Sequence, residues 1–391
     1  MSRIGIYGGA FNPPHTGHIR AAEYAVQALA LDKLLLIPSY VSPHKPLPAG
    51  SATPAQRLAM TGLWAGEKME VCDIELSRGG TSYTYQTVEQ LKLQYPHDEL
   101  VLFMGTDMFL SFHAWKEPAR ILSCVSLAVF YRGEKGEKEK IAEIQREYES
   151  KGHTIYLVEN PVTDISSTQL RRMLVFGCAA PFLDERVLAY IQENGLYGTN
   201  QNYQNLPMEE LEQVVINLLN PNRVKHVLGC RDTAAELAKV WGADEVDAAR
   251  AGLLHDITKA LDGPLQLTLC REYGKVLDEF SENNPKTLHA LTGSMVAERI
   301  FGENQAVVSA IESHTTGKPA MNTLEKIIYV ADYMEPNRDF PGVDKLRHYA
   351  ETDMDAALKL GLETTLEHLK RQGAEVSPES KEALEYLNVK V

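Results

Sequence analysis

The stretch Gly8–Ile19, GGAFNPPHTGHI, constrains this chain most, because it combines glycines, prolines and histidines at one junction. A short apolar run, Ile4–Tyr7, precedes it, and a helical pattern from Arg20 to Ala30 follows. Glycines allow a bulky ligand to approach the backbone closely, and prolines stiffen the turn. The free N–H groups at the start of a helix attract anions. The stretch therefore predicts a strand, a phosphate-binding turn and a helix.

Two histidines add side-chain donors to this turn. His15 and His18 lie three positions apart, which puts both rings on one side of a starting helix. The stretch is neither a G-x-G-x-x-G fingerprint nor a P-loop, because no G-K-[ST] follows. An ordinary turn with surface histidines is the alternative, and we favour the binding site because a structural turn does not require two histidines.

The same residues resemble the GG-x-F-D-P-x-H-x-G-H signature of the nucleotidyltransferase superfamily. The one departure is Asn12, where that superfamily usually has aspartate. The departure removes a carboxylate from the turn and leaves both histidines in place.

Composition limits the classes of protein to consider. The formal net charge of −14 disfavours binding to nucleic acid or to anionic membrane surfaces. No apolar run reaches the length of a membrane span, and the first residues do not have a signal-peptide pattern. Five cysteines without a C-x-x-C motif indicate reduced thiols and a cytoplasmic protein. The sequence does not determine the oligomeric state, and a homo-oligomer is possible.

The 391 residues are enough for two domains, and the first half alternates strand and helix patterns. Strands are predicted over Ile4–Tyr7, Lys33–Pro38, Glu70–Glu75, Leu100–Met104 and Leu127–Tyr131, and helices over Arg20–Leu29, Thr53–Trp64 and Tyr85–Gln94. This alternation predicts a Rossmann-like α/β domain, a parallel sheet with helices on both faces. Ligands of such sheets bind beyond the carboxyl ends of the strands, where further motifs are expected.

Three such motifs contain candidate ring-binding residues. Lys45, in SYVSPHKP, could meet a carboxylate or phosphate, or be a solvated loop lysine. In GGTSYTYQT, Thr81, Ser82 and Thr84 are candidate caps of the helix near Tyr85, and Tyr83 is either a stacking platform or a core aromatic. Trp115 could stack on a pyridine ring or be buried in the core.

Two further motifs contain candidate nucleotide-binding residues. After the strand at Leu100–Met104, Gly105 permits a close approach, and Asp107 could bind a ribose hydroxyl or base, or be an N-cap. In DISSTQLRRML, Ser166 and Gln169 fit a capping box. The same helix start carries hydroxyls and the guanidinium of Arg171, which together form a second anion site.

Taken in order, these motifs resemble nicotinate mononucleotide adenylyltransferases from Ser2 to about Gly198. The resemblance implies transfer of AMP from ATP to nicotinate mononucleotide, giving deamido-NAD and pyrophosphate, with Mg²⁺ accompanying ATP. It implies catalytic roles for His15, His18 and Arg171. The implied ATP-binding residues are Gly8, Gly9, Phe11, His15, His18, Gly105, Asp107, Ile165, Ser166, Ser167, Thr168 and Arg171. The implied nicotinate mononucleotide-binding residues are Lys45, Thr81, Tyr83, Thr84 and Trp115.

The second half has a different character. The polar segment TNQNYQNLP is predicted to be a linker, and the residues after it show helical patterns throughout. Helices are predicted over Met208–Leu218, Val224–Val240, Glu245–Asp256, Pro264–Tyr273, Leu288–Ile300, Gln305–Ser313, Leu324–Tyr333 and Asp353–Arg371. We expect an all-α helical bundle.

Several ionisable residues interrupt these apolar helix patterns, where a lone polar group is costly. They are His226, His255, Asp256, His289, His314 and Asp332. One such histidine is usually a satisfied core residue, whereas a set of four with two aspartates predicts a metal centre. Imidazole with carboxylate favours Fe, Mn, Zn or Co over Ca or Mg.

The order of these residues resembles the HD-domain phosphohydrolases, and RVKHVLG, AGLLHDITK, HTTG and ADYMEP together resemble bacterial symmetrical diadenosine tetraphosphatases. The resemblance implies cleavage of diadenosine tetraphosphate into two ADP by two transition-metal ions, with Fe first among the candidates. It implies that His226, His255, Asp256 and Asp332 hold one metal, and His289 and His314 the other. It also implies catalytic roles for Asp256 and Lys259. Lys259 could neutralise a phosphate or be a solvated lysine, and Arg338 could bind phosphate or cap a helix.

These readings predict a bifunctional enzyme, with a nucleotidyltransferase domain at 1–199, a linker at 200–207 and an HD-domain phosphohydrolase at 208–391. The alternatives concern the second half. It could be a nucleotide-binding regulatory module, or it could hydrolyse another nucleotide phosphoester. The presence of all six ligand-type residues argues against a purely regulatory role.

Overall fold

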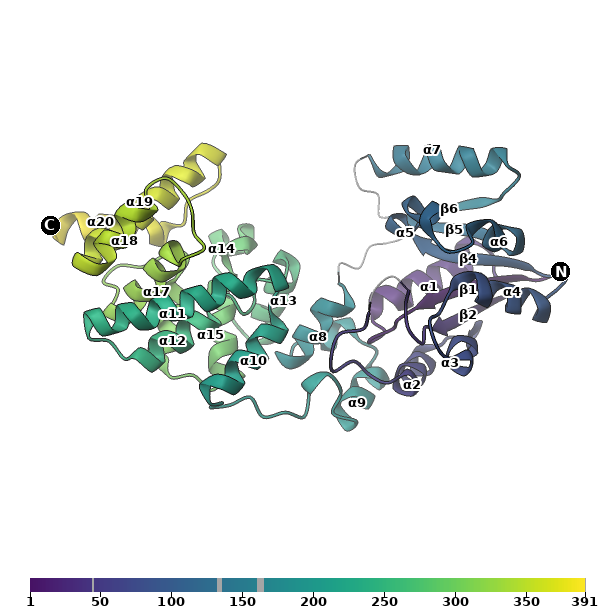
Figure 1. The fold of residues 1–391 in the computed structure, drawn as a ribbon, viewed down its shortest axis with the longest axis horizontal. Coiled ribbons are helices and arrows are strands. Elements are labelled where there is room, and N and C mark those ends of the chain that lie inside the picture. The colour runs from purple at the N-terminus through teal and green to yellow at the C-terminus, as the bar shows by residue number, and fades with distance from the viewer. Residues whose placement is uncertain (44–45, 132–135, 160–164, 391) are drawn as a thin grey trace. The chain divides into compact units, whose positions relative to one another are not determined.

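The computed structural model describes residues 1–391 except 44–45, 132–135, 160–164 and 391. Contacts within it divide the chain into two compact units, Met1–Gln201 and Asn202–Val391. The first unit contains a β-sheet with helices, and the second is built of helices (Figure 1).

Six parallel strands form the sheet of the first unit, in the order β3-β2-β1-β4-β5-β6. The strands are β1 (Arg3–Gly9), β2 (Lys33–Pro38), β3 (Met69–Val71), β4 (Glu99–Gly105), β5 (Ser126–Tyr131) and β6 (Ile155–Glu159). Ile6 of β1 pairs with Leu35 on one side and with Leu102 on the other. The strand order reverses between β1 and β4, which is the switch point where Rossmann-like sheets bind ligands. The predicted α/β fold is confirmed.

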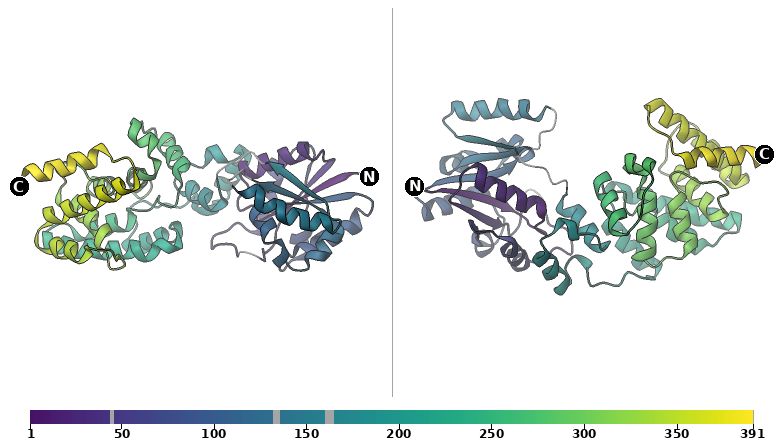
Figure 2. Two further views of the ribbon diagram at one scale, coloured as in Figure 1. Left: turned by 90° about the horizontal axis from the view of Figure 1, so that it is seen from above. Right: turned by 180° about the vertical axis from the view of Figure 1, so that it is seen from behind.

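Helices cover both faces of this sheet (Figure 2). The helices of the first unit are α1 (Thr16–Ala28), α2 (Pro54–Trp64), α3 (Ile74–Arg78), α4 (Thr84–Gln94), α5 (Thr106–Leu110), α6 (Pro118–Cys124), α7 (Glu137–Ser150), α8 (Ser167–Val175) and α9 (Glu185–Glu193). One core of strand residues such as Ile6, Leu102 and Val129 packs against helix residues such as Val88 and Ile121. This core fixes the strand ends that carry the motifs.

The structure corrects the prediction at the third strand and at the sheet edge. The expected strand Glu70–Glu75 ends at Val71, and α3 begins at Ile74, because Ile74 and Glu75 are both buried by a helical turn. The edge strand β6 was not predicted. Its burial alternates only partly, with Leu157 exposed, so the apolar run has a weak strand pattern.

Helix caps are confirmed at α8 and wrong at α4. Ser166 Oγ accepts from the Gln169 backbone N–H at 3.2 Å, and Gln169 Oε1 accepts from the Ser166 N–H at 3.1 Å. The residue before α4 is Tyr83, and no side chain caps this helix. Ser82 Oγ instead accepts from the Tyr40 backbone N–H at 2.9 Å, so its hydroxyl holds the preceding loop.

The second unit is helical, with no strand among its described residues 202–390. Its helices are α10 (Met208–Leu218), α11 (Val224–Trp241), α12 (Glu245–Leu254), α13 (Gly263–Glu272), α14 (Glu279–Asn283), α15 (His289–Arg299), α16 (Gln305–Ser313), α17 (Thr323–Met334), α18 (Val343–Thr352), α19 (Met354–Gln372) and α20 (Pro378–Lys390). α11 packs against α12 and α17, and α15 packs against α16 (Figure 1). The predicted all-α architecture is confirmed, although α14, α18 and α20 were not predicted.

Two details of this unit differ from expectation. α12 ends at Leu254, so His255 and Asp256 lie in the turn that follows and not inside a helix. The end of the predicted linker is bound to the second unit, because Asn205 N–H donates to Phe301 O at 2.9 Å and Arg250 Nη1 to Leu206 O at 2.8 Å. None of the helices in the described ranges has the length and apolar character that a bilayer crossing requires.

Candidate functional sites

The starts of α1 and α8 meet at the switch point of the sheet. Arg171 Nη1 donates to Asn12 O at 2.7 Å, and Ser167 Oγ donates to Pro13 O at 3.2 Å. Two motifs more than 150 positions apart therefore bring together one set of hydrogen-bond donors suited to an anion. The set consists of two helix N-termini, hydroxyls and a guanidinium. Arg171 Nη2 also donates to Thr168 Oγ1 at 3.1 Å, which fixes the guanidinium plane.

The two predicted imidazoles lie side by side, with ring centroids 3.8 Å apart. His18 Nδ1 accepts from the His15 backbone N–H at 3.2 Å, so the other ring nitrogen of neutral His18 carries the proton. Burial lowers the pKa of His18 to about 4, and burial with His18 nearby lowers the pKa of His15 well below its usual value. His15 Nδ1 is buried without a hydrogen-bond partner among the described residues. Both rings are thus neutral donors at pH 7.

Asn12 has a structural role in the turn. Its Nδ2 donates to Ser51 Oγ at 2.8 Å, and its Oδ1 accepts from the Tyr197 hydroxyl at 2.8 Å and the Ala52 N–H at 3.2 Å. An amide supplies both a donor and an acceptor, whereas an ionised carboxylate only accepts. The departure from the superfamily signature is therefore matched by a specific hydrogen-bond network.

The remaining nucleotide candidates lie at the ends of β1 and β4 or at the start of α8. Gly8 and Gly9 end β1, and a Cβ on Gly9 would lie 3.2 Å from the ring of buried Phe11. Gly105 ends β4 and precedes α5, so the alternative of Asp107 as an N-cap is wrong. The Asp107 side chain is exposed in the first turn of α5, Ile165 is buried, and Ser166 is the N-cap of α8.

A small cavity of about 200 Å³ contains three of the predicted ring-binding residues. Tyr83, Thr84 and Trp115 line it together with Pro43, Ala114 and Lys116. Lys116 was not predicted, and its Nζ lies 4.1 Å from the Tyr83 ring centroid. Thr81 does not line the cavity and pairs instead with Val41 in an isolated bridge. Lys45 lies outside the described residues.

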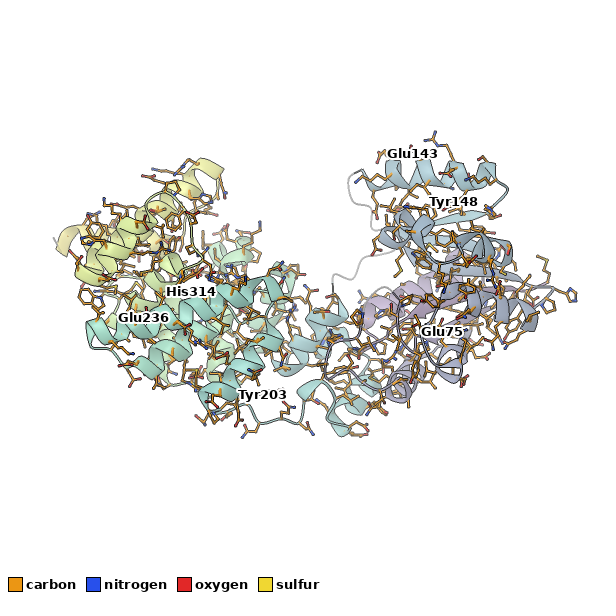
Figure 3. All side chains as sticks on the ribbon, viewed as in Figure 1. Glu75, Glu143, Tyr148, Tyr203, Glu236 and His314 are labelled. Atoms are coloured by element: carbon orange, nitrogen blue, oxygen red, sulfur yellow. The ribbon has the colours of Figure 1, made fainter. Side chains whose placement is uncertain are left out.

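In the second unit, four imidazoles and two carboxylates converge from five helices or their ends, and His314 lies in the interior of the unit (Figure 3). His226 Nε2 lies 3.3 Å from His255 Nε2 and 3.0 Å from Asp332 Oδ1. Donor atoms of His226, His255 and Asp332 lie close enough to share one ion, as do those of His255, Asp256 and His314. The sequence places His226 and Asp332 inside helices, while His255 and His314 follow helix ends.

Asp256 lies between two groups of ligand atoms. Its Oδ2 is 3.7 Å from His226 Nε2 and 3.6 Å from His255 Nε2. Its Oδ1 is 3.6 Å from His289 Nε2 and 3.9 Å from His314 Nε2. The carboxylate thus presents one oxygen to each pair of imidazoles, which is the arrangement that a bridging ligand requires.

The outer nitrogen of each ring faces an acceptor. His255 Nδ1 lies 2.7 Å from Gly252 O, and His314 Nδ1 lies 2.6 Å from Ile311 O. His289 Nδ1 lies 3.0 Å from Lys286 O, and His226 Nδ1 lies 3.1 Å from Glu335 Oε1. Such contacts favour a proton on Nδ1 and leave the Nε2 lone pair free for a metal.

Burial favours the neutral form of three of these rings, those of His255, His289 and His314, as metal ligation requires. It lowers the pKa of His255 and His289 well below the usual value and that of His314 to about 4. Burial alone would raise the pKa of Asp332, but the His226 hydrogen bond and the charges nearby hold this pKa well below its usual value. Buried imidazole with carboxylate is a donor set that fits divalent transition metals.

Cationic side chains surround these ligands. Lys259 and Arg338 line a cavity of about 550 Å³ with His289, His314, Asp332 and Thr315. Lys259 Nζ lies 2.8 Å from His289 Nε2. Burial and the positive charge of Arg223 lower the pKa of Lys259 to about 8. Arg338 Nε donates to Asp332 O at 2.8 Å and Nη2 to Asp332 Oδ1 at 2.6 Å, so it both binds the end of α17 and lines the cavity.

Sequence reasoning missed three residues of this centre. Glu335 contacts His226, Thr315 Oγ1 lies 3.0 Å from His289 Nε2, and Arg223 contacts Asp256. Arg223 and Glu335 stand inside the quoted motifs RVKHVLG and ADYMEP, so the motifs themselves contained the signal.

Comparison with known proteins gives a separate result for each half. Residues 6–173 match the cytidylyltransferase-like family, and residues 223–337 match the HD domain family. The two matches do not overlap, and each covers one of the two sites described above.

Curated relatives divide in the same way. A symmetrical bis(5′-nucleosyl)-tetraphosphatase of Halalkalibacterium halodurans is 40% identical over 169 residues, which are 43% of this chain and 90% of the relative. The protein of the same name from Bacillus subtilis is 38% identical over 44% of this chain and 92% of its own length. A probable nicotinate-nucleotide adenylyltransferase of Dictyoglomus thermophilum is 34% identical over 196 residues, which are 50% of this chain and 99% of the relative.

Proposed function

Because its first half belongs to the nicotinate-nucleotide adenylyltransferase family and its second half to the symmetrical bis(5′-nucleosyl)-tetraphosphatase family, we propose that this chain is a bifunctional enzyme. Residues 1–199 make deamido-NAD from ATP and nicotinate mononucleotide. Residues 208–391 hydrolyse diadenosine tetraphosphate to two ADP. Residues 200–207 link the two domains, and both reactions take place in the cytoplasm.

In the first reaction, the phosphate of nicotinate mononucleotide attacks the α-phosphorus of ATP in line, and pyrophosphate leaves. The protein contributes positioning and charge stabilisation. His15 and His18 donate to the α-phosphate and its bridge. Arg171 and the start of α8 stabilise the departing pyrophosphate, and Mg²⁺ neutralises the phosphates of ATP. Tyr83, Thr84 and Trp115 hold the nicotinate ring.

The observation that carries this proposal is the junction of the two helix starts, where Arg171 Nη1 donates to Asn12 O at 2.7 Å beside two neutral imidazoles. The test is an assay of the full chain with ATP, Mg²⁺ and nicotinate mononucleotide, with deamido-NAD measured by chromatography. His18→Ala is expected to lower kcat/KM by about 10²–10³-fold, the usual effect of removing one donor to a developing charge. Absence of deamido-NAD with the unaltered chain would refute the proposal.

In the second reaction, the tetraphosphate is cleaved at its central anhydride bridge. Four imidazoles and two aspartates would hold two divalent ions, with Fe first among the candidates and Mn, Co or Zn as alternatives. When bound, such ions polarise phosphoryl oxygens and activate water for attack. Asp256 orients both groups of ligands, and Lys259 and Arg338 bind the phosphates, which carry a high negative charge.

The observation that carries this second proposal is Asp256, whose two oxygens lie 3.6–3.9 Å from four Nε2 atoms. The test supplies diadenosine tetraphosphate with Fe²⁺ or Mn²⁺ and measures ADP. Asp256→Asn is expected to abolish ADP formation and to leave adenylyl transfer unchanged. If Asp256→Asn instead altered only adenylyl transfer, the second half would be a regulatory module. If the unaltered chain formed no ADP from diadenosine tetraphosphate but hydrolysed another nucleotide phosphoester, its substrate would be a different one.

A further inference from the structure

Glu335 is a buried carboxylate that belongs to neither of the two ligand groups described above. Its side chain is 1% exposed, and its Oε1 lies 3.1 Å from His226 Nδ1. Its Oε2 accepts from the Asn337 backbone N–H at 2.8 Å and from Asn337 Nδ2 at 2.8 Å. Both oxygens are therefore engaged, and the carboxylate is held in one orientation against the ring.

His226 differs from the other three imidazoles in its outer partner. His255, His289 and His314 each direct Nδ1 at the carbonyl three residues earlier in their own segment. These are neutral acceptors supplied by local backbone geometry. His226 instead meets a charged acceptor from a residue 109 positions away. A charged acceptor forms a stronger hydrogen bond and makes the opposite ring nitrogen a better metal ligand.

The helix that carries His226 is shaped to admit this carboxylate. Gly229 lies one turn beyond His226 on α11, and a Cβ built there would lie 2.5 Å from Glu335 Oε2 and 3.2 Å from Asn337 Nδ2. Real Cβ atoms do not approach other atoms so closely, so any larger residue would push Glu335 from its position. Glycine inside a helix lowers helix stability by about 1 kcal/mol relative to alanine. Room for the Glu335 carboxylate gives a structural reason for glycine at this position.

We infer that Glu335 is a positioning residue of the proposed metal centre: it holds His226 with the proton on Nδ1 and directs Nε2 towards the ion shared with His255 and Asp332. The inference rests on the proposed metal-dependent function of the second half. A purely structural carboxylate could pair with Arg338, but Arg338 Nε lies 4.0 Å from Glu335 Oε1 and donates to Asp332 instead.

The first test measures metal affinity, which does not depend on any substrate. Full-length protein stripped of metal is titrated with Mn²⁺ in competition with a chelating dye. Glu335→Gln keeps the size of the side chain and removes its charge, and we expect Mn²⁺ to bind about 10–100-fold more weakly, the usual effect of losing such an outer partner. The thermal midpoint of the metal-free variant shows whether the fold is retained.

A matched control lies on α17, the helix that ends one residue before Glu335. Glu325 of α17 is also buried, at 3% exposure, and it pairs with Lys318 at 2.6 Å and not with a histidine. Glu325→Gln removes a comparable buried charge, and we expect its Mn²⁺ affinity to stay within twofold of the unaltered chain. Equal losses in the two variants would overturn the inference, because the effect would then be one of general stability.

A second variant tests the role of Gly229. Gly229→Ala is expected to weaken Mn²⁺ binding as Glu335→Gln does, because the added methyl displaces the carboxylate. In the double variant Gly229→Ala, Glu335→Ala, the methyl has room, so the loss should equal that of Glu335→Ala alone. Additive losses, or a Glu335→Gln affinity within twofold of the unaltered chain, would show that Glu335 does not position His226. Failure of the proposed hydrolysis with intact Mn²⁺ binding would refute the substrate assignment alone.

Discussion

At the residue scale, the two candidate sites differ in how the histidine ring nitrogens are used. In the first unit, His18 uses Nδ1 as an acceptor, so Nε2 is left as a donor for anions. In the second unit, four rings direct Nδ1 at acceptors, so Nε2 is left as a ligand for cations. In the functions proposed above, the same side chain would therefore bind opposite charges, and the hydrogen bond on its other nitrogen would decide which.

The low pKa of His18 predicts how the first unit responds to acid. Unfolded histidine takes up a proton as pH falls through about 6.5, whereas folded His18 does so only near a pKa of about 4. The contribution of His18 to the free energy of unfolding is thus fully present above pH 6.5 and falls by about 1.4 kcal/mol per pH unit between 6.5 and 4. Urea unfolding followed by Trp64 and Trp115 fluorescence, in a Trp241→Phe chain, checks this. His18→Gln should flatten the curve, and an unchanged slope would contradict the assignment.

The Asn12 network makes a stability prediction. Asn12→Ala leaves the buried Tyr197 hydroxyl and the Ala52 N–H without their acceptor. Each such loss costs about 1–3 kcal/mol, so we expect the first unit to lose about 2–4 kcal/mol in the same urea assay. Asn194→Ala is the control, because that amide is exposed and bonds only Tyr190 O. A loss no larger than that of the control would mean that the network contributes little.

Residue identity was predictable where a motif carried it. His15, His18 and the six ligand-type residues follow from quoted motifs, and the structure brings each of these two sets together. Glu335 and Lys116 were missed, because a glutamate after an apolar helix and a lysine after a tryptophan have ordinary structural explanations. Their partners, His226 and Tyr83, lie 109 and 33 positions away, and such distances have no local pattern.

At the element scale, the starts of helices carry the first site. α1 and α8 begin at the switch point, and each start places backbone N–H groups beside the same turn. The capping box of α8 was predictable because Ser166 and Gln169 are close in sequence. The caps proposed for α4 were wrong because Ser82 bonds Tyr40, which comes from a distant loop. The edge strand β6 was missed because only one neighbour supports it.

The α8 cap gives a prediction that combines stability with binding. Ser166→Ala removes the acceptor of the Gln169 N–H and should cost about 1 kcal/mol. Fraying of this turn also misplaces Ser167 and Thr168, so we expect a higher KM for ATP with a smaller change in kcat. Steady-state kinetics of deamido-NAD formation measures both. Asp184→Ala removes the equivalent cap of α9 and should leave the KM for ATP unchanged, so equal KM values for both variants would refute this role of α8.

At the scale of the whole molecule, each compact unit contains one of the two candidate sites. The fold class of each half was predictable. Strand and helix patterns alternate in the first half, and helical patterns follow one another throughout the second, and both are strong signals. The metal centre was predicted from the ionisable residues that interrupt apolar helix patterns, and the family resemblance implied how the ligands are grouped. Sequence spacing could not show which helices meet, because packing of α11 against α12 and α17 brings His226 close to Asp332.

Separate sites predict separate losses. Removal of transition metals with a chelator, followed by return of Mg²⁺, should abolish ADP formation from diadenosine tetraphosphate and leave deamido-NAD formation unchanged. His18→Ala should have the reverse effect. Both activities are measured on one full-length preparation, so each serves as the control for the other. Loss of both activities in either condition would show that one half depends on the other.

The uniform direction of the four rings in the second unit has a consequence for amino-acid replacement. The amide nitrogen of asparagine lies near the position of a histidine Nδ1, and the amide oxygen of glutamine reaches towards Nε2, where it can ligate a metal. Asparagine at positions 255, 289 or 314 would therefore preserve the contact with the backbone and lose the atom that faces inwards. Glutamine would lose the contact with the backbone and preserve an atom that faces inwards. A library with both residues at these positions would therefore distinguish effects on the stability of the fold from effects on metal binding.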